Sequence, residues 1–338
     1  MRIAIISPAS ERIPPRQYGG TGRVIDALIK GLIEQGHEVV LYGTGDSLTS
    51  ASLRYIVDAP TDTQNSLMDS DHVKYAFSSA SDFDIIHDHT YFGAATQYSR
   101  YVNTPTVTTL HTVPQPQLVH LYKNFENYPL VSVSQSQQSL FTGANFIKTV
   151  YNGVDLKEFS LDERKGNYML HIGAISWHKG SHIAAEIASH TDIPLVMAGR
   201  ILDPNFFRVY ISPHIQSGKV TYVGEVGGEN RVKLFQQARL LLFPILWPEP
   251  FGLVMIEAMA CGTPVVAFNR GSVSEIIKDE VTGFIVSDRV GVYSAIERIG
   301  LIAPKKCREH VEYNFSNEKM IKQYEAVYRD LIAQNPLT

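Results

Sequence analysis

Two glutamates separated by seven residues, Glu249 and Glu257, lie in the segment WPEPFGLVMIEAMACGTP, which carries the strongest chemical signal in this sequence. Its two prolines and Gly252 predict a loop, and the apolar run that follows predicts a helix. The first N–H groups of a helix have no partner within it, and with the helix dipole they bind anions. We therefore expect a phosphate at this helix start, with one carboxylate for sugar hydroxyls and the other for a ribose diol. The alternative is a loop, helix and strand with a solvated glutamate.

Lys179 precedes a second expected helix, which begins near Ser181. A lysine at a helix start opposes the helix dipole unless an anion compensates its charge. The position therefore favours diphosphate binding over a merely solvated lysine.

Histidines follow two of the expected strands. His111 ends an apolar strand, where a lone histidine is more often structural than catalytic. His87 and His89 lie on the same face of an extended segment, as a pair of metal ligands would. We disfavour a metal, because Asp88 between them points the other way and the Asp82-Phe83-Asp84 sequence lies before a buried strand rather than at its exit.

The glycine-rich sequence Gly19-Gly20-Thr21-Gly22 lies between the first expected strand and a helix expected from Val24. Its amides could face an anion, and a plain flexible turn is the alternative. The third glycine of G-x-G-x-x-G is missing, and no G-K-[ST] occurs at a candidate phosphate loop. Neither a dinucleotide fingerprint nor a Walker loop is therefore indicated.

Short apolar runs alternate with helical patterns through both halves of the chain. Strands are expected at 3–7, 39–42, 85–87, 106–110, 130–133, 168–172, 194–198, 220–223, 240–244 and 264–267, and helices at 24–35, 183–189, 231–238, 253–260, 293–299 and 317–332. Two such successions predict two doubly wound α/β domains with parallel sheets that face one another across a cleft. We expect domains over 1–160 and 161–315, and a C-terminal helix over 316–338.

The composition fits this organisation. The 338 residues allow about two domains, and 44% hydrophobic residues with a net charge of −4 exclude a disordered chain and give no sign of nucleic-acid binding. Two cysteines without a C-x-x-C pair argue against a disulfide framework or zinc site and fit a reducing cytoplasm. No run approaches the roughly 18–20 apolar residues that cross a bilayer, nor does the start resemble a signal peptide. Peripheral contact with the inner face of a membrane stays open.

The segment from Trp247 to Pro264 resembles the Glu-x7-Glu signature of the retaining glycosyltransferases of family 4. Further matches to that family cover nearly the whole chain, in order: Tyr18-Gly19-Gly20-Thr21, His87-Asp88-His89, Val107 to Thr112, Val150 to Asp155, Gly173 to Gly180, Phe243-Pro244, and Gly271-Ser272-Val273-Ser274-Glu275. In the last of these we expect Ser272 to cap a helix and Glu275 to be a helix-start carboxylate. The order and spacing of the motifs are more specific than any one of them.

The resemblance implies the GT-B fold, with two facing Rossmann-like domains: an N-terminal one that binds the acceptor and a C-terminal one that binds a sugar nucleotide. It implies a hexosyltransferase that moves a hexose from a UDP- or GDP-sugar to a hydroxyl of a glycan, lipid or small molecule, with retention, without a metal and without a cofactor. His111, Lys179 and Glu249 would be catalytic. Donor contacts would come from Gly20, Gly173, Lys179, Gly199, Arg200, Glu225, Glu249, Phe251, Gly252, Leu253, Val254 and Glu257.

Ala174 departs from the family, which usually has an arginine directly after the glycine at this point. His178 or Arg200 could supply the missing charge. A sugar-nucleotide epimerase of the same fold and a non-catalytic sugar-nucleotide-binding protein are the alternative functions, and the incomplete glycine fingerprint disfavours an NAD-linked oxidoreductase. The donor base, the sugar, the acceptor, the linkage and the oligomeric state are left open, and the acceptor surface is expected in 47–80 and 115–128.

Overall fold

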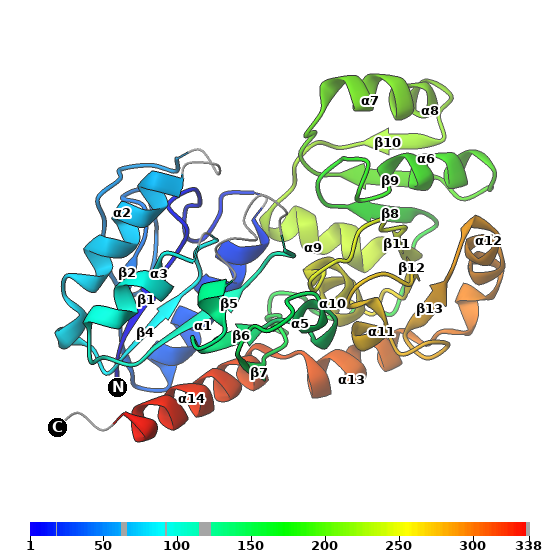
Figure 1. Ribbon diagram of the computed structural model, residues 1–338. Helices are drawn as coiled ribbons and strands as arrows, with labels where there is room; N and C mark the ends of the chain where they lie inside the picture. Colours follow the sequence, from blue (N-terminus) through cyan, green and yellow to red (C-terminus); the bar gives the residue numbers. More distant parts are fainter. Residues whose placement is uncertain (18, 62–65, 92, 115–122, 336–338) are drawn as a thin grey trace. The chain divides into compact units, whose positions relative to one another are not determined.

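The structure is a computed structural model that describes residues 1–17, 19–61, 66–91, 93–114 and 123–335. The chain forms two compact units, one of Met1–Gly153 with Asn317–Thr338 and the other of Val154–Ser316 (Figure 1). Tyr18 of the glycine motif lies outside the described residues, as do parts of the two stretches expected to contact the acceptor, 62–65 and 115–122.

The first unit contains a seven-stranded sheet of order β3-β2-β1-β4-β5-β6-β7, in which every paired strand is parallel. The strands are β1 (Arg2–Ile6), β2 (Glu38–Tyr42), β3 (Ser52–Arg54), β4 (Ile85–Asp88), β5 (Thr106–Leu110), β6 (Leu130–Ser132) and β7 (Phe146–Thr149). The strands buried on both faces are the apolar runs that sequence patterning predicts. The short, partly exposed β3 and β7 lack such a run, and the sequence did not predict them.

Helices cover both faces of this sheet. They are α1 (Gly20–Glu34), α2 (Ser66–Phe77), α3 (Ala95–Tyr98), α5 (Gln135–Ser139) and α14 (Asn317–Gln334), with short 3-10 turns η1 (Ala80–Asp82), η2 (Ser99–Tyr101) and η4 (Lys123–Phe125). The expected start of α1 at Val24 was wrong. The helix begins at Gly20, and the Arg23 N–H donates to the Gly19 carbonyl, so the glycine sequence forms the first turn of the helix rather than a loop before it.

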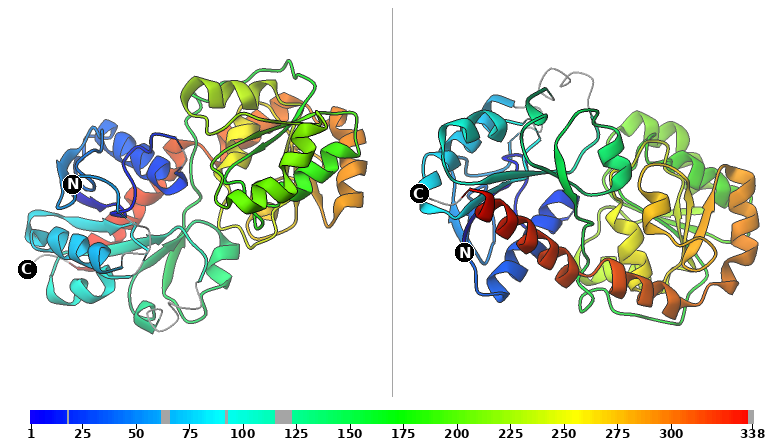
Figure 2. Two further views of the ribbon diagram at one scale, coloured as in Figure 1. Left: turned by 90° about the horizontal axis from the view of Figure 1, so that it is seen from above. Right: turned by 60° about the horizontal axis from the view of Figure 1, so that its bottom comes forward.

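The C-terminal helix α14 packs along α1 within the first unit (Figure 2). Gly31 permits this contact, because a Cβ at that position would lie 1.9 Å from Ile321 Cδ1. A hydrogen bond between His37 Nε2 and Glu325 Oε1 (2.6 Å) adds to the interface. Helix α14 is therefore part of the core of the first unit.

The second unit contains a six-stranded parallel sheet of order β10-β9-β8-β11-β12-β13. Its strands are β8 (Met169–Ile172), β9 (Leu195–Ala198), β10 (Val220–Tyr222), β11 (Leu240–Phe243), β12 (Val265–Phe268) and β13 (Gly283–Val286). Its helices are α6 (Ser181–Ser189), α7 (Pro204–Tyr210), α8 (Ser212–Gln216), α9 (Gly228–Gln237), α10 (Leu253–Ala260), α11 (Val273–Ile276), α12 (Arg289–Arg298) and α13 (Pro304–Asn314), with the 3-10 turn η5 (Ile299–Leu301).

The strand order defines one switch point in each sheet. From β8 the chain runs outward through β9 and β10, then returns to β11 on the other side of β8. In the first unit the same reversal occurs between β1 and β4. In doubly wound sheets ligands bind outside the carboxyl ends of the strands at such points. The loops after β8 and β11, which carry Lys179 and Glu249, therefore emerge where a ligand is expected.

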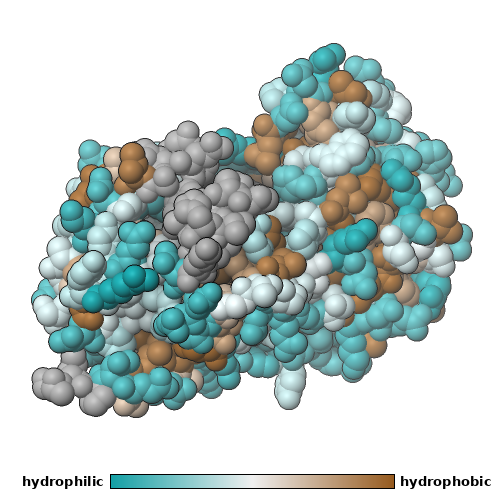
Figure 3. Space-filling view, viewed as in Figure 1, coloured by the Kyte–Doolittle hydropathy of each residue, from teal (hydrophilic) through white to brown (hydrophobic). Residues whose placement is uncertain are grey.

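No helix within the described part of the chain is long and apolar enough to span a membrane. Hydrophilic and apolar residues are interspersed over the face drawn in Figure 3.

Candidate functional site

Lys179 and Glu249 form an ion pair at the switch point of the second unit. The Lys179 ammonium lies 2.5 Å from Glu249 Oε2, and the two side chains are only 15% and 10% exposed. Trp247 donates its Nε1–H to the same oxygen (2.7 Å), and the ammonium lies 5.0 Å from the centre of its indole ring. The sequence named Lys179 and Glu249 separately, and the structure brings them together with Trp247.

Close backbone contacts fix the two loops that carry this pair. The Leu246 N–H donates to the His178 carbonyl (2.9 Å), which ties the loop after β11 to the loop after β8. Gly180 has a φ of 70°, and a Cβ there would lie 1.9 Å from the Pro244 carbonyl oxygen. Only glycine fits at this crossing.

The turn after β12 supports the Glu249 loop from the other side. The Ser272 N–H donates to the Glu249 carbonyl (3.0 Å), and the Ser272 hydroxyl donates to the Phe251 carbonyl (2.7 Å). Ser272 therefore precedes α11 as expected, but its side chain does not cap that helix, contrary to the prediction. At Gly271, a Cβ would lie 2.3 Å from the Glu249 carbonyl oxygen.

Helix α10 begins beside Glu249 without a side-chain cap or an acidic residue in its first turn. Gly252, with a φ of 83°, takes the N-cap position that the sequence predicts, and Phe251 is buried against Phe315. Gly252, Leu253 and Val254 are only partly buried. Since the first amides of a helix have no acceptor within it, this end of α10 is suited to an anion.

Glu257 lies on α10 and pairs with Arg231 of α9. Both residues are buried, and sequence reasoning did not identify Arg231 as a site residue. The Nε of Arg231 has no hydrogen-bond partner in the part of the chain described here. Arg231 therefore holds and orients the Glu257 carboxylate through this buried ion pair. The Arg231–Glu257 pair joins two adjacent helices and has no sequence motif, so the sequence alone could not predict it.

The glycines after β8 and β9 contact each other. A Cβ at Gly199 would lie 1.7 Å from the Gly173 carbonyl oxygen. The Ile175 N–H donates to the Arg200 carbonyl (2.8 Å), so Arg200 lies beside the segment where Ala174 replaces the usual arginine. Ala174 is buried, whereas Arg200 is exposed.

His178 is the other candidate for the missing charge. Burial and the neighbouring Lys179 lower the pKa of His178. A histidine with a lowered pKa is neutral at pH 7, so Arg200 suits this role better.

Glu225 lies in the loop after β10, partly exposed. Tyr222 precedes it and donates its hydroxyl to the Gly199 carbonyl (2.7 Å). Burial and the Glu225 charge both raise the pKa of Tyr222, which keeps this hydroxyl protonated. The Gly199 N–H donates to the Gly224 carbonyl (2.8 Å), so the loops after β9 and β10 are joined.

In the first unit, three histidines cluster at the carboxyl ends of β4 and β5. The rings of His87 and His89 are 4.0 Å apart, and His89 Nδ1 lies 2.8 Å from His111 Nε2. Both ring nitrogens of His87 have partners, the Tyr328 hydroxyl (2.7 Å) and the Thr109 hydroxyl (2.8 Å). Burial lowers the pKa of His87 to about 3 and that of His111 to about 4, so these rings are neutral at pH 7.

No cluster of three or more histidine, cysteine or acidic side chains suited to a metal occurs among the described residues.

At the start of α1, the Glu11 carboxylate lies where an anion was expected to approach. Glu11 accepts a hydrogen bond from the Gly22 N–H, and a Cβ at Gly19 would lie 2.2 Å from Glu11 Oε1. Burial raises the pKa of Glu11 to about 7. No sequence pattern predicts this contact, because Glu11 lies in the irregular segment after β1.

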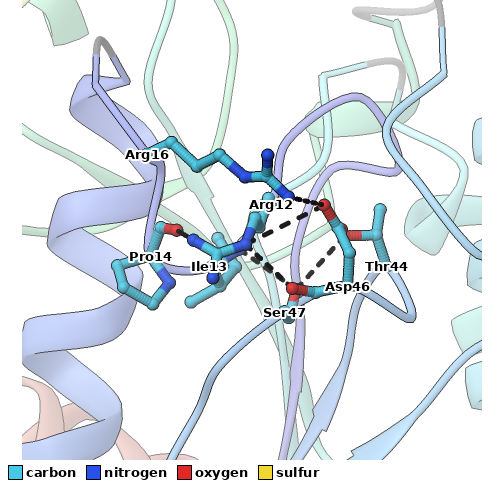
Figure 4. Close-up of polar contacts among 7 residues, drawn as sticks. All are labelled: Arg12, Ile13, Pro14, Arg16, Thr44, Asp46 and Ser47. Carbon is cyan, nitrogen blue, oxygen red and sulfur yellow. Dashed lines mark hydrogen bonds and ion pairs between the residues drawn. The ribbon is translucent and has the colours of Figure 1, made fainter.

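Figure 4 shows the contacts that hold this segment. Arg12 donates to the carbonyls of Asp46 (2.8 Å) and Pro14 (2.6 Å), and the Ile13 N–H donates to the Ser47 hydroxyl (3.1 Å). The exposed Arg16 lies 4.0 Å from the Asp46 carboxylate. The loop after β2 thus fixes the path of the chain toward Glu11 and α1.

Two doubly wound parallel sheets, one with a lysine–glutamate pair and an uncapped helix start at its switch point, place a cation and helix amides where doubly wound folds bind ligands. Residues 155–308 match the glycosyl transferases of group 1, and residues 18–158 match glycosyltransferase family 4. The chain therefore belongs to the family 4 glycosyltransferases.

Individual relatives agree with this assignment. An uncharacterised glycosyltransferase of Methanocaldococcus jannaschii is 27% identical, over 85% of both chains. AviGT4, a glycosyltransferase involved in avilamycin A biosynthesis, is 25% identical, with a TM-score of 0.78 over 98% of both chains. HepE from Anabaena, solved in complex with UDP-glucose, is 17% identical, with a TM-score of 0.77 over 98% of this chain and 100% of its own. The fold is therefore GT-B, as the sequence motifs predict.

Proposed function

We propose that this protein is a retaining hexosyltransferase that moves a hexose from a UDP- or GDP-sugar to a hydroxyl acceptor without a metal. The observation that carries the proposal is the Lys179–Glu249 pair beside the uncapped start of α10. A cation, a carboxylate and free amides at one switch point are the groups that a sugar diphosphate needs. HepE, which has the same fold, was solved with UDP-glucose, and this supports a sugar nucleotide as donor.

The second unit would bind the donor. In the structure the Lys179 ammonium is neutralised by Glu249. On donor binding, we infer that Lys179 turns to the diphosphate and that Glu249, still held by the Trp247 Nε1–H, accepts hydrogen bonds from the sugar hydroxyls. Glu257, oriented by Arg231, would accept hydrogen bonds from the ribose hydroxyls. In this exchange Lys179 gains the diphosphate as a new charge partner and Glu249 gains the sugar hydroxyls as hydrogen-bond donors, so neither group is left without a partner.

In the transfer step, the bond between the anomeric carbon and the β-phosphate oxygen breaks while the acceptor oxygen bonds to the same face of that carbon. The acceptor proton passes to the departing phosphate oxygen. Negative charge grows on the diphosphate, and Lys179 with the first amides of α10 would stabilise it. The first unit would bind the acceptor, with His111 contacting the transferred sugar and Gly20 close to the donor phosphate or the acceptor.

Gly173, Gly199 and Glu225 would line the nucleotide, with the backbone after β10 reading the base. The buried, unpaired cysteines Cys261 and Cys307 support a reducing compartment. We propose the cytoplasm, with an acceptor met in solution or at the inner face of the membrane.

Arg200 would replace the arginine that the family usually has at Ala174. Arg200→Ala should weaken nucleoside diphosphate binding by about tenfold, because a charge-assisted contact is lost. Arg208→Ala, a change on the neighbouring helix α7, is the control. Unchanged affinity and turnover in Arg200→Ala would remove Arg200 from the donor site.

The experiment for the whole proposal is a panel of UDP-, GDP- and ADP-sugars, each followed for nucleotide release, with a candidate acceptor mixture and with or without EDTA. We expect release from one donor class, unaffected by EDTA, and an acceptor product of unchanged anomeric configuration. An epimerised donor formed without acceptor would instead indicate an epimerase. Nucleotide binding without turnover of any donor would indicate a sugar-nucleotide-binding protein.

A further inference from the structure

His89 and His111 share a hydrogen bond that constrains where each ring carries its proton. His89 Nδ1 and His111 Nε2 are 2.8 Å apart, and the two rings meet edge to edge, with centres 5.2 Å apart and planes inclined by 22°. His89 is fully buried, and its other nitrogen, Nε2, is buried without a hydrogen-bond partner in the described ranges. Burial lowers the pKa of both rings, so each carries one proton at pH 7.

Two arrangements of these protons are compatible with the contact. If His111 donates from Nε2, neutral His89 must carry its own proton on Nε2, which is a buried N–H without an acceptor. If His89 donates from Nδ1, only a lone pair is left unpaired at His89 Nε2. A buried N–H without a partner is rare and costly, and an unpaired acceptor is tolerated more often. The second arrangement is therefore favoured, and in it His111 carries its proton on Nδ1.

We propose that His89 is a positioning residue that holds His111 as the Nδ1–H tautomer, so that His111 offers a hydrogen-bond donor to the reacting sugar. The Nε2 lone pair of His111 is occupied by His89 and cannot take a proton from the acceptor. In the proposed transferase, on which this part of the inference rests, His111 thus orients a sugar hydroxyl oxygen and does not act as the general base.

The elements around His89 keep its ring in place. The His87 ring packs against it at a tilt of 42°, and both nitrogens of His87 are held, one by Tyr328 of α14 and the other by Thr109 of β5. Tyr324 of α14 contacts the same Thr109 hydroxyl (3.1 Å). The C-terminal helix therefore fixes the orientation of the His87 ring, which packs against His89. His89 in turn fixes His111 through their shared hydrogen bond.

The direct test is the tautomer itself, read on the full chain by nitrogen-15 NMR of labelled histidine, with the His111 signals assigned by their loss in His111→Gln. We expect a protonated Nδ1 and an unprotonated Nε2 at pH 7. A protonated Nε2 at His111 would overturn the proposal. This readout needs neither substrate nor activity, so it stands even if the proposed transferase function fails.

Two amide variants of His89 separate positioning from folding. The asparagine amide of His89→Asn can occupy the place of Nδ1 and donate to His111, whereas the glutamine amide of His89→Gln reaches the place of Nε2. We expect His111 to keep its tautomer in His89→Asn and to lose the preference in His89→Gln. Once a donor is known, turnover should fall about tenfold in His89→Gln, with the donor KM within about twofold, and recover in His89→Asn.

If His89 had only a structural role, His89→Asn and His89→Gln of equal thermal stability would show the same His111 tautomer and the same turnover. That result would contradict the assignment. If neither variant folds, the wild-type tautomer still decides the proposal.

Discussion

At the scale of single residues, the site consists of charged groups that neutralise one another. Lys179 contacts Glu249, and Arg231 contacts Glu257. Neither ion pair is a reason for high stability, since desolvation offsets much of the attraction between buried charges. The two pairs orient both carboxylates, and Lys179 is available to exchange partners in the proposed donor complex.

The two glutamates should therefore respond differently to the loss of charge. Glu249→Gln should lower kcat by about 100-fold, since sugar contacts that strengthen in the transition state are lost, while nucleoside diphosphate affinity stays within about threefold. Glu257→Gln should raise the Kd of the nucleoside diphosphate about tenfold with little effect on kcat. Steady-state kinetics and calorimetry measure both quantities, with the exposed Glu229→Gln as control. Equal effects of the two variants on kcat and Kd would refute the assignment of roles.

Glu11 should make stability depend on pH. Its pKa is raised to about 7 in the folded chain from 4.5 in the unfolded chain, so the folded state binds the extra proton between these values. The stability that Glu11 contributes is therefore present below about pH 4.5 and lost as the pH rises to about 7. Glutamine cannot ionise, so Glu11→Gln removes this loss. Its free energy of unfolding should exceed that of the wild type by about 1–3 kcal/mol, with the smaller value at pH 5 and the larger at pH 8.

Urea unfolding of Glu11→Gln and of the wild type at pH 5 and pH 8 measures the difference between their free energies of unfolding. The other titrating groups contribute equally to both proteins, so they cancel in this difference. The same stability difference at pH 5 and pH 8 would mean that Glu11 is not buried at the start of α1.

At the scale of elements, the loops of the second unit depend on glycines where one backbone crosses another. Gly180, between β8 and α6, meets the Pro244 carbonyl after β11, and this crossing sets the distance between the loops that carry Lys179 and Glu249. Side-chain volume at this point would move the two loops apart.

Gly180→Ala should therefore destabilise the second unit by about 3 kcal/mol, from the left-handed backbone and the added Cβ contact. Gly218→Ala is the matched control, because Gly218 also has a positive φ (77°) but nothing lies within 4 Å of its Cβ position. It should cost about 1 kcal/mol. Tryptophan fluorescence in urea reports this unfolding, since Trp177 and Trp247 both belong to the second unit. Equal losses in the two variants would show that the crossing at Pro244 adds nothing.

Sequence periodicity predicted the buried strands and α10 well, because parallel strands covered on both faces are continuous apolar runs. It missed β3, β7, β13, α2 and α13 and placed the start of α1 too late, because exposed side chains or glycines interrupt the apolar pattern there. Motifs, rather than periodicity, singled out Lys179, Glu249 and His111 as candidates. Arg231, Glu11 and the contact of His89 with His111 depend on tertiary packing between distant segments, and no local pattern encodes such contacts.

At the scale of the whole molecule, the groups proposed for the two substrates belong to different units. Lys179, Glu249 and the start of α10 lie in Val154–Ser316, and His111 lies in the unit that includes α14. If the second unit alone binds the nucleotide, changes in the first should alter transfer and leave nucleotide affinity intact.

The central claim is that Lys179 and the start of α10 form a diphosphate site, and calorimetric titration of the full chain with UDP and GDP tests it most directly. We expect one of the two to bind, Lys179→Ala to weaken that binding at least about tenfold, and both His111→Ala and the exposed-lysine control Lys233→Ala to bind as the wild type does. Unchanged affinity in Lys179→Ala, or a loss of similar size in His111→Ala, would contradict the account.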